Sequence, residues 1–379
     1  MKLLHLSDLH LGKLVNGFSM VEDQKYILKQ ILEITTVEHP DAVLIAGDVY
    51  DKAIPSEGAV LALDEFLVGL SDVCPQIFLI SGNHDSAERL AFGGRLMRPG
   101  IHVSPVYEGA VAPVTLEDEY GPADVWLLPF VKPAQVRHSF PEEEIASYTD
   151  AVACAVRHMP LDPDRRNILV SHQFVTGAQR CQSEELSVGG TDNVDAAVFE
   201  PFDYVALGHI HGPQQVGRPT VRYCGTPLKY SFSELHHKKS VTVVELAEKG
   251  RVELRTVPLT PARDLAELRG EYADLTGPDA AEKYAAQKDC YLRIILTDEQ
   301  EVFNAAGELR KHYPYMMALE YDNTRTRSSF TLDTPDKVEE RSPLELFDEL
   351  FTKQNGRAMD EAERACLAGI LERAQEEQG

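Results

Sequence analysis

The sequence lacks several features that mark common classes of protein. None of its 379 residues lie in an apolar run of about 18 or more, so we expect no membrane-spanning helix. Its six cysteines are scattered without a Cys-x-x-Cys pair, which excludes a zinc knuckle or a disulfide framework and predicts free thiols in a cytoplasmic protein. No Gly-x-x-x-x-Gly-Lys-[Ser/Thr] loop occurs, so this chain is not expected to bind a nucleotide and any ATP dependence must come from a partner.

Positive charge is also scarce. The chain has 37 lysines and arginines against 61 aspartates and glutamates, a formal net charge of −24. A polyanion should on average avoid such a surface, which argues against strong nucleic-acid binding by this chain alone. The apolar and charged fractions of 43% and 26% are typical of a globular protein. The length predicts two domains, or one large domain with appendages.

Short apolar runs alternate with helical patterns in the first half of the chain. The runs that predict buried strands cover residues 3–6, 42–46, 77–80, 125–129, 168–170 and 204–207. Apolar residues spaced by about 3.6 positions predict helices over residues 21–37, 60–70 and 145–159. This alternation predicts a layered α/β domain, in which ligands gather at the carboxyl ends of the strands.

Seven side chains of the metal-ligand type follow these apolar runs. They are Asp8, His10, Asp48, Asn83, His172, His209 and His211. Oxygen and imidazole ligands without thiolate suit Mn²⁺, Mg²⁺, Fe²⁺ or Zn²⁺. Seven ligands are too many for one ion and fit two ions that share a carboxylate. Two ions roughly 3.5–4 Å apart recur in enzymes that hydrolyse phosphoesters, so the pattern predicts a binuclear phosphoesterase.

The ligands divide into two sets. We assign Asp8, His10, Asp48 and His211 to one ion, and Asp48, Asn83, His172 and His209 to the other. Asp48 is the shared ligand because a carboxylate has two oxygens. His84 follows a ligand directly, so we expect its ring to face the substrate and to protonate the leaving oxygen, with Asp85 orienting the ring.

The second half of the chain has a different pattern. Strand-like pieces follow residue 221, and a second, α+β unit is expected from about residue 262. In the tail, residues 342–345 read Ser-Pro-Leu-Glu, a capping box with proline at the first helical position. Two apolar stripes then predict a helix–turn–helix hairpin, and they consist of Leu344, Phe347, Leu350 and Phe351, and of Leu367, Ile370 and Leu371.

The motifs around the ligands resemble those of known phosphoesterases. Asp8-x-His10, Gly47-Asp48, residues 82–85, His172 and Gly208-His209-x-His211 are similar to the calcineurin-like metallophosphoesterase superfamily. Residues 6–13, 47–51, 171–175, 208–214 and 223–234 further resemble the SbcD family of bacterial nuclease subunits, as does the start of the tail.

This resemblance implies an architecture and an activity. Residues 1–260 would form a metallophosphoesterase sandwich, residues 262–335 a DNA-capping domain, and residues 342–379 a segment that binds an SbcC-type coiled-coil ATPase. It also implies Mn²⁺-dependent cleavage of double-stranded DNA ends and hairpins, and a homodimer formed through helices near residues 60–70 and 87–97.

Phosphate binding needs local lysine or arginine. The candidates are Lys13, Arg89, Arg95, Lys238 and Lys239, and the two stripes of the tail are the candidates for partner contacts. A partner that supplies most of the electrostatic attraction would reconcile the acidic chain with a DNA substrate.

Two other functions remain open. A small-molecule phosphodiesterase, acting on nucleotides or cyclic nucleotides with the same metals, fits the net acidity. The extra α+β unit and the capped tail argue against it, because a small substrate does not require them. A non-catalytic scaffold that recruits a partner through its tail is disfavoured by the complete set of ligands together with His84.

Overall fold

The computed structural model describes residues 1–184 and 192–327, and in the tail residues 347–348, 350–352, 355–360, 362–367 and 370. The chain divides into two compact units, Met1–Leu265 and Ala266–Gly379. Among the described residues, no helix is both long enough and apolar enough to span a membrane.

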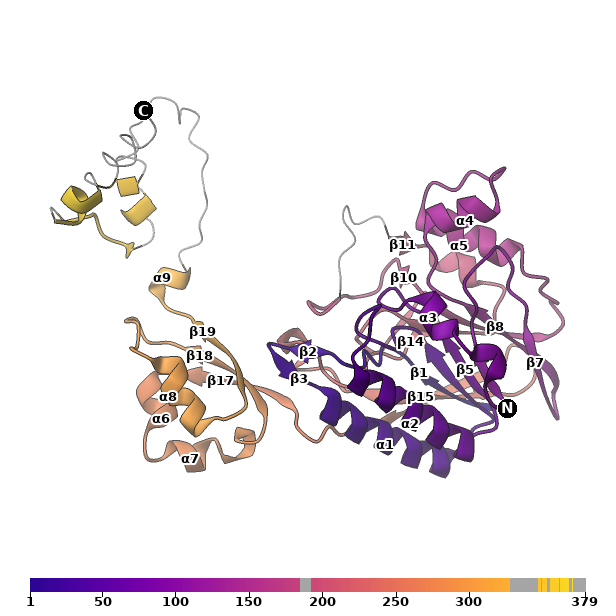
Figure 1. Ribbon diagram of the computed structural model, residues 1–379, viewed down its shortest axis with the longest axis horizontal. Coiled ribbons are helices and arrows are strands. Elements are labelled where there is room, and N and C mark those ends of the chain that lie inside the picture. Colours follow the sequence, from indigo (N-terminus) through magenta and orange to yellow (C-terminus); the bar gives the residue numbers. More distant parts are fainter. Residues whose placement is uncertain are drawn as a thin grey trace. The chain divides into compact units, whose positions relative to one another are not determined.

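Two six-stranded sheets form the first unit (Figure 1). In spatial order, the first sheet contains β16 (Val252–Pro258), β15 (Ser240–Leu246), β1 (Lys2–Leu6), β4 (Ala42–Ala46), β5 (Ile77–Ile80) and β6 (Ile101–Val103). The second contains β13 (Gln214–Val216), β14 (Arg218–Tyr223), β12 (Tyr204–Gly208), β9 (Arg166–His172), β8 (Gly121–Leu128) and β7 (Val114–Asp118). The strands β1, β4, β5 and β6 are parallel to one another, as are β14, β12, β9 and β8.

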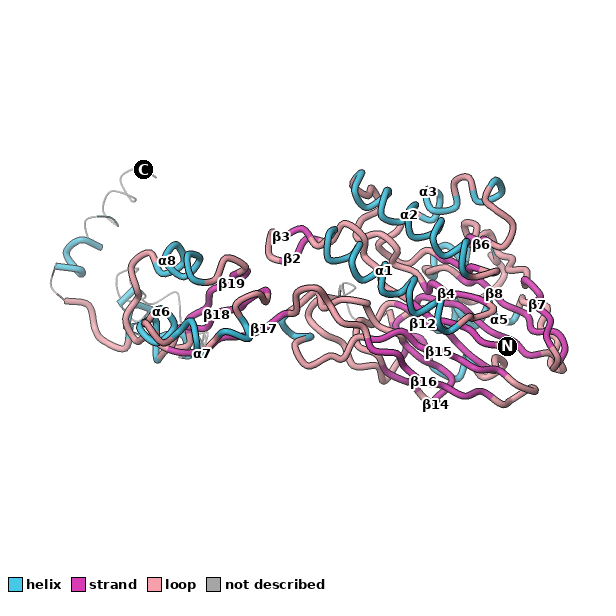
Figure 2. Tube along the Cα trace, turned by 90° about the horizontal axis from the view of Figure 1, so that it is seen from below, coloured by secondary structure: helices cyan, strands magenta, loops and turns pink. Residues whose placement is uncertain are grey.

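The two sheets pack face to face between two layers of helices. Leu44 and Phe78 of the first sheet meet Val125 and Ile168 of the second in a fully buried core. The outer face of the second sheet, including Trp126, packs against α5 (Tyr148–Arg157). On the opposite side, α1 (Val21–Glu38) and α2 (Glu57–Val73) run along the first sheet (Figure 2). The predicted layered α/β sandwich is confirmed.

Local sequence signals account for these elements. Every residue of β4 is buried because both faces of the sheet are covered, which is why its sequence is apolar without alternation. The helix predicted over residues 145–159 begins only at Tyr148, since Ser147 and Asp150 form a capping box there. Ser56 likewise caps α2 by accepting a hydrogen bond from the Ala59 amide.

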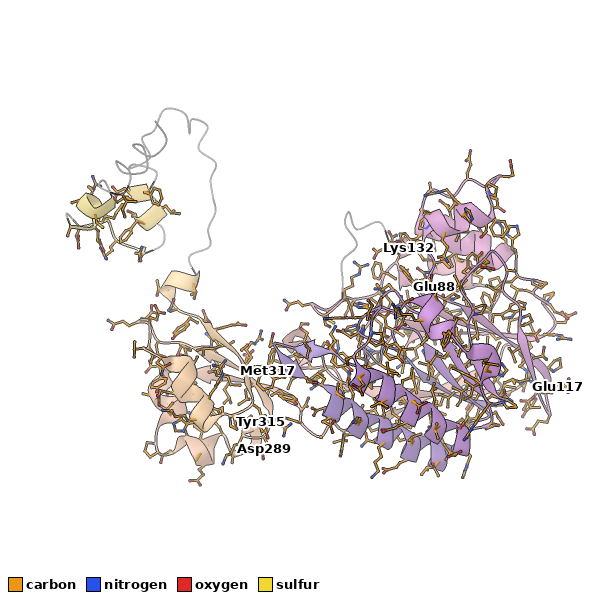
Figure 3. All side chains as sticks on the ribbon, in the orientation of Figure 1. Glu88, Glu117, Lys132, Asp289, Tyr315 and Met317 are labelled. Atoms are coloured by element: carbon orange, nitrogen blue, oxygen red, sulfur yellow. The ribbon has the colours of Figure 1, made fainter. Side chains whose placement is uncertain are left out.

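The predicted helix near residues 87–97 is broken in two. The helix α3 spans only Ala87–Ala91, and a separate 3₁₀ turn covers Gly94–Leu96. Gly93 adopts a φ of 75° between them, a left-handed conformation that ends the helix. The side chain of Glu88 lies on α3, and that of Lys132 lies just before α4 (Pro133–Ser139) (Figure 3).

Short elements complete the first unit. They are β2 (Leu14–Val15), β3 (Phe18–Ser19), β10 (Phe174–Val175), β11 (Asn193–Val194) and the 3₁₀ turns Ala196–Phe199 and Phe232–Glu234.

The second unit is a small α+β structure. Its three-stranded sheet has the order β17 (Leu265–Gly270), β18 (Tyr291–Leu296) and β19 (Met316–Tyr321). The helices are α6 (Tyr272–Thr276), α7 (Ala280–Lys283), α8 (Ala305–His312) and α9 (Thr324–Arg327), with a 3₁₀ turn at Ala285–Gln287. Leu275, Leu292 and Leu309 lie in its core.

The tail is described in part. Residues 347–348, 350–352 and 362–367 are helical, whereas the predicted linker after residue 327 and the stripe residues Leu344 and Leu371 lie outside the described residues. The hairpin and the boundary at residue 342 therefore stay predictions.

Candidate metal centre

The predicted ligands lie at the carboxyl ends of strands from both sheets. Asp8 and His10 follow β1, Asp48 follows β4, and Asn83 follows β5. His172 is the last residue of β9, and His209 and His211 follow β12. The structure brings all seven side chains together at one end of the sandwich. Six are buried, with exposed fractions from 0% to 7%, and Asn83 is half-buried.

Unusual backbone conformations direct these side chains inward. Asp8, His10, Asp48 and His209 have φ values of 53°, 45°, 47° and 102°. Residues with a Cβ rarely adopt positive φ, and such strain concentrates at functional sites. The Asp8 and His10 amides donate to the carbonyl oxygens of Gly47 and Asp48, at 3.0 and 2.9 Å. These bonds hold the loops after β1 and β4 together.

Three glycines make the close approach of the loops possible. A Cβ on Gly82 would lie 2.1 Å from Asp48 Oδ1, and one on Gly47 would lie 2.5 Å from His172 Nδ1. A Cβ on Gly208 would lie 1.9 Å from the carbonyl oxygen of Ala46. These positions require glycine because any side chain would collide with a ligand or with the backbone behind one.

The seven side chains form two adjoining clusters. In one, His10 Nε2 lies 3.1 Å from His211 Nε2, and ligand atoms of Asp8, His10 and His211 all lie within 4.8 Å of one another. In the other, Asn83 Oδ1 lies 2.8 Å from His209 Nδ1 and 3.0 Å from His172 Nε2.

One oxygen of Asp48 faces both clusters. Its Oδ2 atom lies 3.7 Å from His10 Nε2 and 3.3 Å from His172 Nε2. This position between the two sets of ligands is the one that a shared carboxylate requires.

The donor atoms fit divalent cations. Asp8 Oδ2 and His209 Nε2 are buried and have no hydrogen-bond partner among the described residues, and buried polar atoms without partners are costly. Nε2 of His10 and Nε2 of His211 also face each other at 3.1 Å, close enough for both to bind one ion. Carboxylate, amide and imidazole donors that converge in this way suit two hard or borderline divalent ions.

Burial and mutual contacts shift the pKa values in this centre. Burial raises the pKa of Asp8 to about 6 and lowers that of His209 to about 3. Burial also opposes protonation of His172, but the neighbouring Asp48 carboxylate outweighs it and raises the pKa of His172 to about 9. Without cations, the carboxylates and imidazoles therefore share protons among themselves.

His84 lies at the edge of the centre with one ring nitrogen held. Its Nδ1 lies 3.0 Å from the carbonyl oxygen of Asp51, to which an Nδ1–H can donate. The other nitrogen, Nε2, lies 4.0 Å from Asp48 Oδ2, and the side chain is 12% exposed. The ring thus presents a free nitrogen beside the candidate metal positions.

The orienting role predicted for Asp85 is wrong in this geometry. Its carboxylate accepts hydrogen bonds from the amides of Val49, Tyr50 and Gly82, at 3.1, 2.9 and 2.9 Å. Asp85 therefore holds the loops after β4 and β5 together, and the Asp51 carbonyl orients the His84 ring. A backbone acceptor has no side-chain signature in a sequence.

The predicted DNA contact at Lys239 is also wrong. The residue is only 5% exposed, and its Nζ atom donates to Glu234 Oε2, Thr226 Oγ1 and the His211 carbonyl oxygen, at 2.5, 2.6 and 2.9 Å. Lys239 lies behind His211 and cannot reach DNA. With Glu234, Ser183 and Glu184 it belongs to a group of residues beside His211 that sequence reasoning missed.

Three of the other proposed DNA contacts, Lys13, Arg89 and Lys238, are at least partly accessible. Lys13 Nζ pairs with Asp51 Oδ1 at 2.7 Å, next to the His84 loop, and is half-buried. Arg89 and Lys238 are exposed, and the side chain of Arg95 lies outside what the structure describes.

Part of the apolar tail is exposed. Phe347, Leu350 and Ile370 have exposed fractions of 47%, 36% and 49%, while Phe351 and Leu367 are half-buried.

Comparison with known proteins agrees with this geometry. Residues 1–213 match the calcineurin-like phosphoesterase family, and residues 261–355 match the type 5 capsule protein repressor C-terminal domain. The chain is 31% identical to the D subunit of the nuclease SbcCD from Staphylococcus epidermidis over 382 residues, which cover 98% of this chain and 100% of that protein. It is 32% identical to the corresponding protein of Staphylococcus saprophyticus over 324 residues, 84% of each chain.

A dimetal phosphatase from Danio rerio is a distant structural match, with 10% identity and a TM-score of 0.40 over 69% of this chain and 98% of that one. That similarity is too low to carry an argument. The coverage and identity of the sequence matches are sufficient: the chain belongs to the calcineurin-like phosphoesterases and, among them, to the SbcD family of SbcCD nuclease subunits.

Proposed function

We propose that this protein is the nuclease subunit of an SbcCD-type complex and hydrolyses phosphodiesters at double-stranded DNA ends and hairpins. The observation that carries the proposal is the convergence of seven ligand side chains, six buried and one half-buried, on a centre with His84 at its edge. The near full-length similarity to proteins named as nuclease subunits supports it.

Two divalent cations complete the centre in this proposal. Asp8, His10, Asp48 and His211 hold one, and Asp48, Asn83, His172 and His209 hold the other. When bound, two such ions activate water for attack and neutralise charge on the phosphate. We propose Mn²⁺ as the ion, and the donor set also admits Mg²⁺, Fe²⁺ or Zn²⁺.

His84 is the general acid of the proposed reaction. The Asp51 carbonyl holds its Nδ1, so the proton exchanged with the substrate is the one on Nε2. Transfer of that proton to the leaving oxygen avoids the release of an unstable alkoxide. Asp48 accepts the His84 amide at 2.9 Å through Oδ1, which fixes the loop that carries the ring.

A basic cleft beside the centre is the proposed path of the DNA backbone. It has a volume of about 430 Å³, and its charged or titratable lining residues are Arg180, Arg222, His236, His237 and Lys238. Gly212, which follows the ligand His211, also lines it. No carboxylate is among the described residues that line it, and the neighbouring Asp192 pairs with Arg180 at 3.0 Å, so phosphates would meet mainly cationic and neutral groups there although the chain is acidic overall.

Exposed apolar residues support the proposed protein contacts. Val60, Leu61 and Val68 on α2 are 44–51% exposed, and Phe92 and Leu96 after α3 are 85% and 90% exposed. We propose that these surfaces form a homodimer, since exposed apolar groups of this size favour an interface.

The two remaining segments have roles in the complex. We propose that residues 262–335 cap the DNA and that the tail, residues 342–379, docks on the SbcC-type ATPase through its exposed apolar residues. A cytoplasmic location is part of the proposal, and the six cysteines, none of which forms a disulfide, support it.

The choice of substrate can be tested directly. In Mn²⁺, the protein should cleave a DNA hairpin, and bis-p-nitrophenyl phosphate should serve as a general control for phosphodiesterase activity. Turnover of cyclic nucleotides and of the small ester, without cleavage of hairpins or blunt ends in the presence or absence of the ATPase, would replace the nuclease with a small-molecule phosphodiesterase.

A further inference from the structure

A buried ion pair lies behind the metal centre and takes no direct part in the chemistry above. Glu234 and Lys239 are 0% and 5% exposed, and their charged atoms are 2.5 Å apart. Burying two charges is costly, so an ion pair in this position is weak evidence for stability and points to another role.

The ion pair connects to the ring of the candidate metal ligand His211 through the hydroxyl group of Ser183. Ser183 Oγ lies 2.6 Å from Glu234 Oε1 and 2.7 Å from His211 Nδ1. A carboxylate beside a lysine only accepts hydrogen bonds, so the Ser183 hydroxyl donates to Glu234. The hydroxyl oxygen then accepts a hydrogen bond from His211 Nδ1, so His211 must carry its hydrogen on Nδ1.

This tautomer has a consequence at the centre. With hydrogen on Nδ1, the lone pair of His211 lies on Nε2, the atom that faces His10 Nε2 at 3.1 Å. A series of hydrogen bonds runs from Lys239 through Glu234 and Ser183 to His211. The positive charge of Lys239 sets the direction of each bond in this series.

Lys239 and the neighbouring Glu184 also fix the backbone of His211. Lys239 donates to its carbonyl oxygen at 2.9 Å, and Glu184 Oε1 accepts its amide at 2.7 Å. By contrast, His172 is oriented by a backbone atom, since its Nδ1 lies 2.8 Å from the carbonyl oxygen of Ala46. Substitutions of side chains can therefore change the tautomer of His211 without touching His172.

We propose that Lys239, Glu234 and Ser183 are positioning residues that fix the tautomer of His211 and so set the affinity of one metal position, the one shared with Asp8 and His10. The inference rests on the proposed two-metal function. The second position, with Asn83, His172 and His209, is independent of this chain of hydrogen bonds.

Substitution of Ser183 tests the proposal most cleanly. In Ser183→Ala, the affinity of one of two Co²⁺ or Mn²⁺ ions should fall by roughly 10–100-fold, as is typical when the hydrogen-bond partner of a ligand histidine is removed. Ser183→Thr keeps the hydroxyl and should restore the affinity. Calorimetric titration measures both ions, and the visible spectrum of the Co²⁺ protein reports the changed coordination.

Glu234→Gln provides a second test, with Glu142→Gln, at an exposed position, as its matched control. The Glu234 variant should weaken the same single ion, and the control should bind both ions as the wild type does. If circular dichroism shows that Glu234→Gln does not fold, the comparison of Ser183→Ala with Ser183→Thr decides whether the proposal holds.

The measurements test the proposed function and the proposed positioning residues separately. If the wild type binds fewer than two ions, the proposed function fails. If the wild type binds two ions and Ser183→Ala binds both with wild-type affinity and an unchanged Co²⁺ spectrum, the proposed chain of positioning residues is wrong while the proposed function stands. An equal loss of both ions would also overturn the inference, because it predicts a selective effect.

Discussion

Individual residues of the centre have separable roles, and His84 is the clearest case. Its Nε2 is free, 4.0 Å from Asp48 Oδ2, while the seven ligands are other side chains. His84→Gln should lower the rate of DNA cleavage by at least about 100-fold, the usual contribution of a general acid. Metal affinity and DNA affinity should stay close to wild type.

The measurement is single-turnover cleavage with saturating Mn²⁺, with metal binding followed in parallel. Unchanged turnover in this variant would remove His84 from the mechanism. A parallel loss of metal would show that it acts as a ligand.

A buried histidine outside the centre makes stability depend on pH. His5 is fully buried, its Nδ1 lies 2.8 Å from the Tyr204 hydroxyl, and burial lowers its pKa to about 3. In the unfolded chain, His5 binds a proton below about pH 6.5. In the folded protein, it binds a proton only below about pH 3. The contribution of the neutral His5 ring to the free energy of unfolding is therefore complete above pH 6.5 and is lost as the pH falls toward 3.

His5→Gln removes this titration. The free energy of unfolding of the wild type, relative to the variant, should fall by up to about 1.4 kcal/mol per pH unit below pH 6.5. Urea unfolding of both proteins in chelator between pH 7.5 and 5 measures the difference, in which other titrating groups cancel. A difference independent of pH would contradict the lowered pKa.

The limits of sequence-based prediction are visible at this scale. All seven candidate ligands could be found because each follows an apolar run that becomes a strand. Ser183, Glu234 and Lys239 could not, because they meet His211 only when loops 23 or more residues apart in sequence fold together. Lysine is almost never buried without a partner. Because the sequence does not reveal the partners of Lys239, this residue was predicted to lie on the surface.

At the level of elements, the buried strands were predictable, whereas only some of the peripheral ones were. The run over residues 42–46 matches β4 because a strand covered on both faces must be apolar throughout. The edge strands β6 and β7 were missed, since their half-buried residues give no continuous run. The helix predicted near 87–97 is divided at Gly93, where a positive φ is needed.

The loops that carry the ligands depend on glycine. In Gly82→Ala, the new Cβ would lie 2.1 Å from Asp48 Oδ1, so the shared carboxylate must move. Binding of both metals and DNA cleavage should fall by at least about tenfold, because one displaced ligand serves both positions. Isothermal titration with Mn²⁺ measures the loss.

Gly58→Ala is the matched control, since it lies in α2 and its Cβ would meet only Val21, at 3.7 Å. Helix propensity predicts that it leaves metal binding unchanged and stabilises the fold by up to about 1 kcal/mol. Wild-type metal affinity in Gly82→Ala would show that the loops have more freedom than these distances allow.

The tail offers a test of partner binding. Deletion of residues 342–379 removes the exposed Phe347, Leu350 and Ile370 but none of the candidate ligands. The shortened protein should keep its fold and its two metals and lose co-purification with the coiled-coil ATPase. Retained binding to the ATPase after deletion would place the docking surface elsewhere.

At the scale of the whole molecule, charge is unevenly distributed. The chain has a net charge of −24, yet the cleft beside His211 is lined by cationic and neutral side chains. The sequence predicted the overall repulsion of polyanions, but the cleft combines Arg180, Arg222 and Lys238 from separate loops and strands and could not be found from composition. A local cationic cleft on an acidic protein is consistent with a partner that supplies the rest of the DNA affinity.

The division into units was predicted only in outline. A second unit was expected from about residue 262, and the compact units divide after Leu265. The expected mixture of strands and helices is present, but β17 was not foreseen because only two of its six residues are buried and they are not adjacent.

The central claim is that the metal centre of this protein hydrolyses DNA. The most direct measurement is cleavage of a hairpin-capped DNA duplex by the purified protein, with and without the ATPase and ATP, in Mn²⁺, after chelation and after restoration of the metal. We expect cleavage that stops on chelation, returns with Mn²⁺ and is at least about 100-fold slower in His84→Gln. Cleavage that persists without metal, or a fully metal-loaded protein that leaves the hairpin intact even with its partner, would contradict it.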